Sequence, residues 1–352
     1  MSKKNLAWLP GLVVLALAAS WLLTQVAHGE AVHAPRDFRV AAAPALTDVY
    51  PERRTAFPDG VTGLADVVYS VIPGYRPLIV DVYLPATAPQ QVHPLVLYIH
   101  GGGWVGGHTR HSGALADFPG VLARLASEGF VVASLEYRLA REAAFPAQLQ
   151  DARAALRFLR ANAARFGIDG TRVGVWGGSA GGHLAALVAS TCGDASFDPP
   201  LPPVPRAEPP APPPAAPTPP PVGSECAQSA AIWYGVFDFT AMPSSGNVLQ
   251  LLGCTDDSCR VERARAASPS THFDRAEPPF LLIHGEDDKT VPAAQSHAAE
   301  ARLRALGVPV EAIYLPGADH SFVAATPAAT REATLKATNA TFDFFHRTLH
   351  PN

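Results

Sequence analysis

The feature that most constrains this chain is a regular alternation of strand-like and helix-like stretches from residue 60 onward. Short runs of β-branched and other apolar residues alternate with longer stretches whose apolar residues recur at helical spacing. Strands that alternate with helices predict an α/β fold, with a mostly parallel sheet and helices on both faces. In such sheets the functional residues gather at the carboxyl ends of the strands.

The same pattern predicts where each element lies. We expect strands at residues 64–70 and 78–84, which form a hairpin pair, and then at 95–100, 130–137, 172–176, 230–234, 279–284 and 310–315. We expect helices at residues 113–128, 146–166, 183–190, 293–306 and 328–349. All of them fit one domain over residues 60–350, which is long enough to bury a large core.

The N-terminus has the layout of a secretory signal peptide. Lys3 and Lys4 precede an uncharged apolar stretch at residues 6–23, and the small residues Ala27 and Gly29 follow it. We therefore expect residues 1–29 to be removed and the protein to be exported, either periplasmic or secreted. The alternative is an uncleaved anchor, because the apolar stretch is nearly long enough to span a bilayer. Only in that case would the membrane be a partner.

One further segment stands out by its composition. Residues 199–221 contain fourteen prolines, which cannot donate the hydrogen bonds of a helix or a strand. We interpret this run as a surface insertion within the domain; a ligand for a proline-recognising partner is the alternative. Residues 238–275 are expected to form a small cap-like segment, and residues 30–59 an N-terminal extension.

The four cysteines are compatible with disulfides in an exported protein. Cys254 and Cys259 enclose a short loop, and Cys192 and Cys226 flank the proline-rich run, so either pair could form a bridge. Three pairings are possible and the sequence does not choose among them. The cysteine spacing, without nearby histidine pairs, is poor for zinc, and we expect no metal and no cofactor. The formal net charge of −4 gives no indication of nucleic-acid binding.

The stretch from Gly177 to Gly181 reads GGSAG and lies between a predicted strand and a predicted helix. G-x-S-x-G in this context is typical of a serine nucleophile on a sharp turn, which makes Ser179 the candidate. A close-packed turn without chemistry is the alternative. A phosphate-binding loop is excluded, because it needs a lysine after the last glycine and His183 follows Gly182 instead.

A second glycine-rich loop, His100 to Gly103, follows the predicted strand at 95–100. Glycine amides approach a developing oxyanion without hindrance, which makes the N–H groups of Gly102, Gly103 and Ala180 the candidate oxyanion donors. A dinucleotide-binding loop is a poor alternative, because Trp104 intrudes where backbone should meet a pyrophosphate.

The base and its orienting acid should follow the serine in the order acid, then histidine. His320 lies in a short polar loop after the predicted strand at 310–315 and is the candidate base. Asp287 and Asp288 both follow the strand at 279–284, and the spacing does not choose between them.

These motifs resemble the α/β-hydrolase fold. HGGGW, GVWGGSAGGHLAAL, HGEDDKTVP and GADHSF are similar to those of bacterial carboxylesterases and feruloyl-esterase-like proteins, near the hormone-sensitive-lipase family, and the resemblance runs from about residue 62 to 347. It implies that Asp288 is the acid. Gly178 stands where lipase-like relatives often carry an acidic residue, which favours the feruloyl-esterase-like branch.

The expected function is that of a serine hydrolase that cleaves small-molecule carboxylic esters through an acyl-enzyme, with Ser179, His320 and Asp288 as the triad. Trp104, Tyr234 and Phe322 are expected near the substrate. Two alternatives are a peptidase or amidase on the same triad and a non-catalytic binding protein. The sequence does not indicate an oligomeric state.

Overall fold

The computed structural model describes residues 53–72, 74–86, 91–199 and 225–350. The predicted leader at 1–29, its alternative as an anchor at 6–23 and nearly all of the proline-rich run at 199–221 lie outside the described residues. Within the ranges that are described, no helix combines the length and the apolar character needed to cross a bilayer. Residues 52–352 group as one compact unit.

One sheet organises this unit, and its order is β1-β2-β3-β5-β4-β6-β7-β8-β9. The strands are β1 (Arg53–Ala56), β2 (Thr62–Ser70), β3 (Leu78–Leu84), β4 (His93–Ile99), β5 (Val131–Leu135), β6 (Ile168–Gly178), β7 (Ser229–Trp233), β8 (Phe280–Gly285) and β9 (Val310–Leu315). The pairs from β1 through β3 to β5 are antiparallel, and those from β5 across to β9 are parallel. The predicted α/β fold with a mostly parallel sheet is confirmed.

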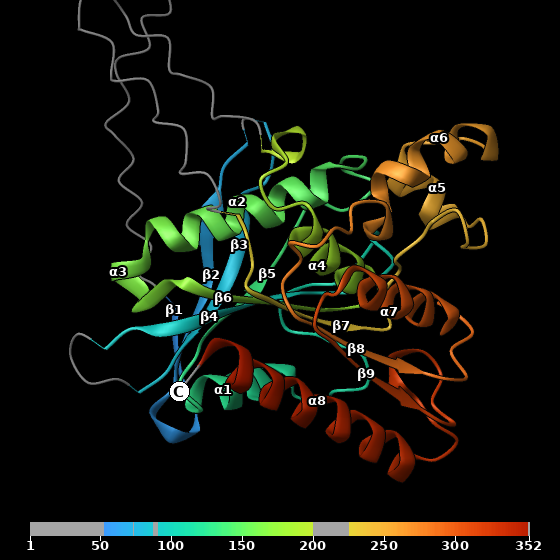
Figure 1. Ribbon diagram of the computed structural model, residues 1–352. Helices are drawn as coiled ribbons and strands as arrows, with labels where there is room; N and C mark the ends of the chain where they lie inside the picture. Colours follow the sequence, from blue (N-terminus) through green and yellow to red (C-terminus); the bar gives the residue numbers. More distant parts are fainter. Residues whose placement is uncertain (1–52, 73, 87–90, 200–224, 351–352) are drawn as a thin grey trace, which may run out of the picture. The chain divides into compact units, whose positions relative to one another are not determined.

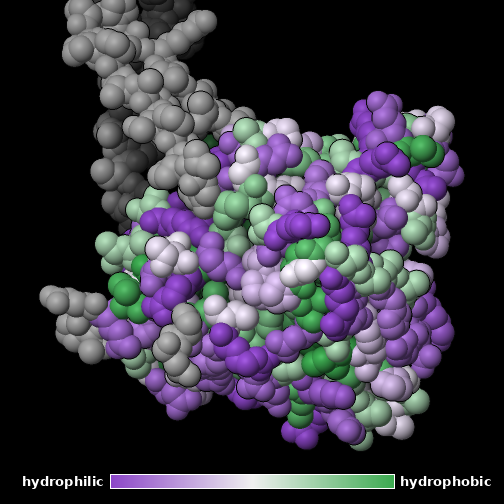
Figure 2. All heavy atoms as spheres, in the orientation of Figure 1, coloured by the Kyte–Doolittle hydropathy of each residue, from purple (hydrophilic) through white to green (hydrophobic). Residues whose placement is uncertain are grey.

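Helices cover both faces of the sheet (Figure 1). They are α1 (Phe118–Ser127), α2 (Ala147–Ala161), α3 (Ala163–Phe166), α4 (Ala180–Ser190), α5 (Gly246–Leu252), α6 (Asp257–Ala267), α7 (Ala294–Leu306) and α8 (Pro327–Leu349). Apolar side chains of α2, α4 and α7 pack on one face, and those of α1 and α8 on the other. On the side seen in Figure 2, hydrophilic residues predominate and hydrophobic ones lie scattered among them.

Among the boundaries that differ from the sequence-based expectation, two have a clear physical reason. Strand β1 lies within residues 30–59, expected to be an extension, and pairs with β2, so the sheet begins before residue 60. All four β1 residues are exposed, and an edge strand of this kind leaves no apolar pattern to detect. Helix α1 begins at Phe118 rather than at 113, because the Asp117 side chain caps it and accepts the Gly120 N–H.

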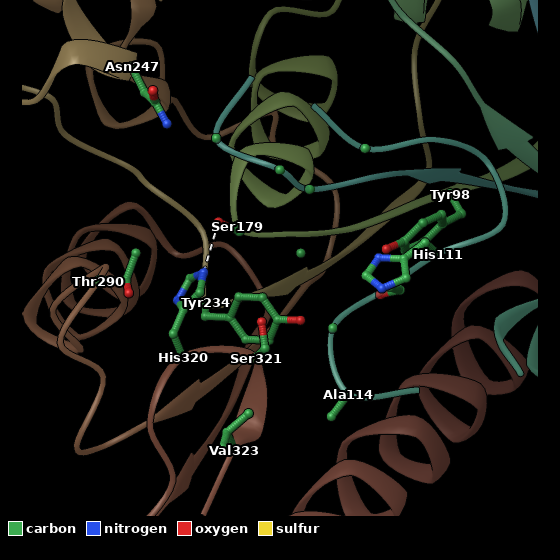
Figure 3. A pocket seen from close by; sticks show the side chains of 17 residues that line it. Tyr98, His111, Ala114, Ser179, Tyr234, Asn247, Thr290, His320, Ser321 and Val323 are labelled. Carbon is green, nitrogen blue, oxygen red and sulfur yellow. Dashed lines mark hydrogen bonds between the residues drawn. The ribbon is translucent and has the colours of Figure 1, made fainter. Parts of the chain in front are cut away.

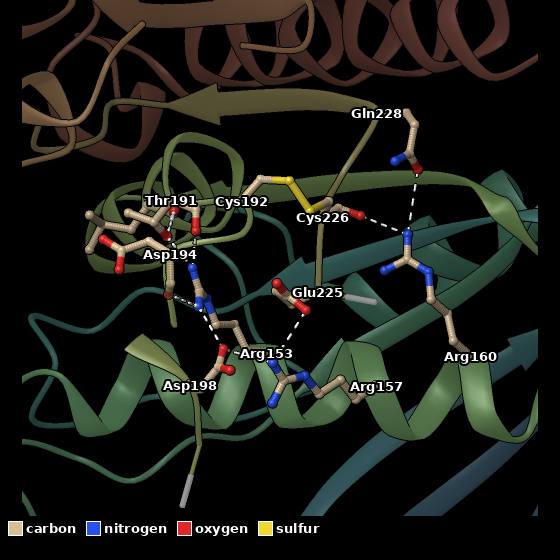
Figure 4. Close-up of a disulfide and its surroundings, with 11 residues drawn as sticks. Arg153, Arg157, Arg160, Thr191, Cys192, Asp194, Asp198, Glu225, Cys226 and Gln228 are labelled. Carbon is tan, nitrogen blue, oxygen red and sulfur yellow. Dashed lines mark hydrogen bonds and ion pairs between the residues drawn. A yellow bond between two sulfur atoms is a disulfide. The ribbon is translucent and has the colours of Figure 1, made fainter. Parts of the chain in front are cut away.

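The two ends of the proline-rich insertion are held together at its base (Figure 4). A disulfide joins Cys192 to Cys226, with the two Cα atoms 4.9 Å apart. Arg157 of α2 donates to Asp198 at 2.7 Å and to Glu225 at 3.3 Å, residues that lie on opposite sides of the insertion. Chain entry and exit therefore meet at one place on the core.

Arg157 thus clamps the two ends of the insertion, and two further arginines on the same face of α2 add to this clamp. Arg153, which is fully buried, donates to the carbonyl oxygens of Thr191 and Asp194 and to the Asp198 carboxylate. Arg160 donates to the carbonyl oxygen of Cys226 at 2.6 Å. The fold of the core at this point is fixed by residues outside 200–224.

We expect that replacing residues 200–224 with a Gly/Ser linker of about six residues, which spans up to about 20 Å, leaves the ester hydrolysis predicted from the sequence within about twofold of the wild type. The reason is that the clamp brings the two ends together and that no described residue between 190 and 228 lines the pocket identified below. Steady-state kinetics and circular dichroism of the purified variant provide the check. A folded variant with much lower turnover would contradict this expectation.

Candidate active site

Ser179 occupies the sharp turn between β6 and α4. Its backbone has φ 56° and ψ −121°, a conformation that L-residues rarely adopt. A Cβ on Gly177 would lie 2.3 Å from the Gly181 carbonyl oxygen, and a Cβ on Gly181 would lie 1.9 Å from that of Ile99. Only glycine fits at either position, which accounts for the G-x-S-x-G spacing.

His320 lies between Ser179 and Asp288 (Figure 3 shows the first of these contacts). Its Nε2 is 3.0 Å from the Ser179 Oγ, and its Nδ1 is 2.7 Å from Oδ2 of Asp288. The three residues follow β6, β8 and β9, so loops at the carboxyl ends of parallel strands bring them together. Asp287 is exposed and does not contact His320 among the described interactions.

The Asp288 carboxylate is shielded from solvent and fully partnered. Its Oδ1 accepts the N–H groups of Thr290 and Val291, both at 2.8 Å, and its Oδ2 lies 3.3 Å from Nε2 of His284. Burial raises the pKa of this carboxyl, but the hydrogen bonds from His284, His320 and the Val291 amide outweigh burial and hold the pKa well below its usual range. Asp288 therefore stays ionised at neutral pH.

Asp319 ties the loop of the acid to the loop of the histidine. Its Oδ1 accepts the N–H of Lys289 at 2.9 Å and that of His320 at 2.7 Å. These amide hydrogen bonds hold the pKa of the Asp319 carboxyl below its usual range. Asp319 was not among the predicted site residues, although it stands beside the candidate base in the GADHSF motif.

The glycine loop after β4 approaches the same point. Gly102 has φ +119° and Gly103 has φ +60°, and a Cβ on Gly102 would lie 2.3 Å from the Gly106 carbonyl oxygen. Within the described part of the chain, neither amide donates to a protein acceptor. The Ala180 N–H is the first amide of α4, where helical amides have no partner within the helix. Gly102 and Gly103 line the pocket; Ala180 is buried directly behind Ser179.

His100 supports the glycine loop through a hydrogen bond from its buried ring. It is fully buried, its ring stacks on Tyr137 with centroids 4.4 Å apart, and its Nδ1 lies 2.7 Å from the Gly101 carbonyl oxygen. Burial lowers the pKa of His100 to about 4, so the ring is neutral at pH 7 and Nδ1 donates to that carbonyl.

Two of the three aromatic residues expected near the substrate do not line the pocket. Trp104 is 5% exposed and donates from Nε1 to Nδ1 of His183, whose Nε2 lies 2.7 Å from the Ala267 carbonyl oxygen. Its indole therefore connects the glycine loop to α4 and α6. Phe322 is buried against Trp233, with ring centroids 5.2 Å apart. Both side chains are drawn into the core by their apolar area.

Tyr234, the third aromatic residue, does line the pocket. Its ring packs edge-on against His320 with centroids 4.8 Å apart. It also fills the space beside Gly178, where a Cβ would lie 3.0 Å from the tyrosine ring. A side chain before Ser179 would therefore require Tyr234 to move, which explains why glycine stands there.

The pocket around Ser179 has a volume of about 680 Å³. Several residues that line the pocket were not predicted. Thr290 and Ser321 lie inside the quoted motifs but have no role in the triad, and the others belong to no motif: Tyr98, His111, Ser112, Gly113, Ala114, Asn247 and Val323. The aspartate and proline at residues 117–119 are typical of a helix start, so they could have predicted that α1 begins after residue 114. Residues 111–114 would then have been expected in a loop. Among the described residues no cluster of histidine, cysteine, aspartate and glutamate could hold a metal ion.

All four cysteines are paired in the structure. The second disulfide joins Cys254 to Cys259, between α5 and α6 of the predicted cap-like segment. Of the three pairings that the sequence left open, the structure has the one that joins neighbours in the chain. Two disulfides are compatible with an oxidising compartment.

Comparison with known proteins covers both halves of the domain. Residues 80–210 match the family model described as BD-FAE, and residues 228–351 match that of the prolyl oligopeptidase family. The esterase LipC of Mycobacterium tuberculosis is 32% identical over 252 residues, which are 69% of this chain and 57% of LipC. The chain thus spans little more than half the length of this curated relative.

Solved structures share the fold. A truncated carbohydrate esterase from gut microbiota is 24% identical with a TM-score of 0.66, and the match covers 84% of this chain and 99% of that protein. A thermophilic esterase from Thermogutta terrifontis is 24% identical with a TM-score of 0.61, covering 82% of this chain and 94% of that one. At these identities the likeness concerns the fold alone.

Proposed function

The chain belongs to the α/β-hydrolase superfamily, in its carboxylesterase lineage, and from this premise we propose that it is a serine hydrolase of carboxylic esters. The observation that carries the proposal is the continuous chain of contacts from Ser179 Oγ through the His320 ring to the buried Asp288 carboxylate. LipC, which matches 69% of this chain, is an esterase by name, and this supports the same assignment.

Acylation follows from this geometry. Ser179 Oγ attacks the carbonyl carbon of the ester while Nε2 of His320 accepts the hydroxyl proton. Asp288 holds Nδ1–H of His320 and stabilises the imidazolium that forms. The negative charge that develops on the carbonyl oxygen is bound by the N–H groups of Gly102, Gly103 and Ala180. His320 then gives its proton to the leaving alkoxide, which departs as an alcohol.

Deacylation repeats the sequence with water. His320 accepts a proton from the water as its oxygen attacks the acyl carbon, and then returns that proton to Ser179 Oγ, which releases the carboxylic acid. The side chains in contact in the structure thus account for both steps, and none of these steps calls on a cofactor.

The test is a panel of p-nitrophenyl esters of increasing acyl length, run with the purified protein. We expect saturable hydrolysis of at least the short-chain esters. A folded protein that hydrolyses none of them would contradict the proposal.

A peptidase or amidase is the second candidate, because residues 228–351 match the prolyl oligopeptidase family. That match covers Asp288 and His320, which would have the same roles in the hydrolysis of esters and of amides. p-Nitroanilides with the same acyl groups as the ester panel separate the two: the ester proposal expects the anilides to be much poorer substrates, and preference for the anilides would favour the second candidate.

We propose further that the protein is exported, and the two disulfides support this placement. N-terminal sequencing of the native protein tests it. A mature chain that begins near residue 30 is the expected result; an intact N-terminus in the membrane fraction would instead favour the anchor, and an intact N-terminus in the cytosol would contradict export.

A further inference from the structure

A residue of the cap-like segment, Asn247 on α5, lines the same pocket as Ser179. It lies about seventy positions from Ser179 in the sequence and belongs to none of the motifs. In Figure 3 its side chain points from α5 toward the glycine loop and Ser179. No described residue forms a hydrogen bond with its amide group, and the side chain is exposed. The amide is therefore free to bind a ligand in the pocket.

Helix α5 is held firmly enough to position this side chain. Its residues Val248, Leu251 and Leu252 are buried in the core. The Leu251 carbonyl oxygen accepts the Phe145 N–H at 2.7 Å. The disulfide between Cys254 and Cys259 fastens the end of α5 to α6. Asn247 is thus presented by a rigid element.

The side-chain amide of Asn247 lies beside Gly103, one of the three proposed oxyanion donors. A Cβ placed on Gly103 would be 2.6 Å from the Asn247 Nδ2 atom, closer than real Cβ atoms approach any neighbour. The Asn247 side chain therefore packs on the Gly103 backbone. Among the described residues that line the pocket there is no aspartate or glutamate, so nothing there competes for a hydrogen bond from this amide as a carboxylate would.

We propose that Asn247 donates a hydrogen bond from its side-chain amide to the oxyanion beside Gly103, so that the cap supplies a contact to the transition state. This inference rests on the proposed ester hydrolysis. A donor whose hydrogen bond strengthens as charge develops on the oxyanion acts on kcat more than on KM. The oxyanion would then accept hydrogen bonds both from the backbone N–H groups of the glycine loop and α4 and from the Asn247 side chain.

The test compares Asn247→Ala and Asn247→Asp in the full-length protein. Loss of the donor in Asn247→Ala is expected to lower kcat about 10- to 100-fold, with KM within about twofold. Asn247→Asp keeps the size of the side chain but places a negative charge beside the oxyanion, so its kcat should be lower still. An acidic residue in the first turn of a helix is favourable, so the melting temperature of Asn247→Asp should not fall.

Gln250→Glu is the matched control, since it adds the same charge to the same helix at a residue that does not line the pocket. We expect its kcat to equal that of the wild type. A wild-type kcat in Asn247→Asp, or an effect confined to KM in both Asn247 variants, would overturn the inference. If the wild type itself cleaved no ester and a fluorophosphonate failed to label Ser179, the proposed function would fail instead.

Discussion

Ser179→Ala is expected to lower kcat for ester hydrolysis by at least about 10⁴-fold, because Ser179 Oγ is the one hydroxyl among the described residues that hydrogen-bonds Nε2 of His320. The variant should fold normally. Alanine at this position retains the backbone turn, and the hydroxyl removed makes no described hydrogen bond besides that to His320. The measurement is steady-state turnover of a short-chain p-nitrophenyl ester, with the melting temperature as the control for folding.

Residual activity needs a matched control, because contaminating esterases contribute background hydrolysis. The variant His320→Ala, purified in parallel, gives an independent measure of this background, since it lacks the base but keeps Ser179. Both variants should fall to the same low level, because residues that act as one unit are not additive. Turnover of Ser179→Ala close to that of the wild type would show that another residue is the nucleophile.

The second large effect is expected for Asp288→Asn, which should lower kcat about 10³- to 10⁴-fold. The amide oxygen can still accept the N–H groups of Thr290 and Val291, so the loop is kept. The amide nitrogen, however, would face Nδ1 of His320 and favour the tautomer that carries its proton on Nε2. That tautomer cannot accept the proton of Ser179.

Asp287→Asn provides the matched control, because the two aspartates are neighbours and only Asp288 contacts His320 in the structure. We expect Asp287→Asn to retain full turnover. Equal losses in the two variants would contradict the assignment of the acid.

The pH dependence follows from the depressed pKa of the Asp288 carboxyl. A carboxyl whose pKa is lower in the folded than in the unfolded state stabilises the fold above about pH 4 and loses this contribution as the pH falls further. Asp288 therefore does not titrate between pH 5 and 9. Between pH 5 and 9, kcat/KM should therefore show no change that comes from titration of Asp288.

The candidate triad could be predicted because each member occupies a place that physics restricts. Ser179 lies on a strained turn that requires glycine two residues before and two residues after it, and the G-x-S-x-G motif reflects this requirement. His320 and Asp288 follow predicted strands, and the carboxyl ends of parallel strands meet at one edge. The choice of Asp288 over Asp287 came only from the resemblance to a family, because spacing treats neighbours alike.

The walls of the pocket could not be predicted in the same way. Asn247 reaches Gly103 only because of how α5 packs on the core, and nothing in its local sequence records that contact. Trp104 illustrates the opposite error: it follows the glycine loop directly, yet its indole turns inward to hydrogen-bond His183. Proximity in sequence to a motif therefore does not place a side chain in the pocket.

The most direct test of the central claim is covalent labelling with a fluorophosphonate, followed by peptide mapping by mass spectrometry. The account predicts one adduct per chain, on the peptide that contains Ser179, and no adduct in Ser179→Ala. The absence of labelling in a folded protein, or an adduct on a different serine, would contradict it.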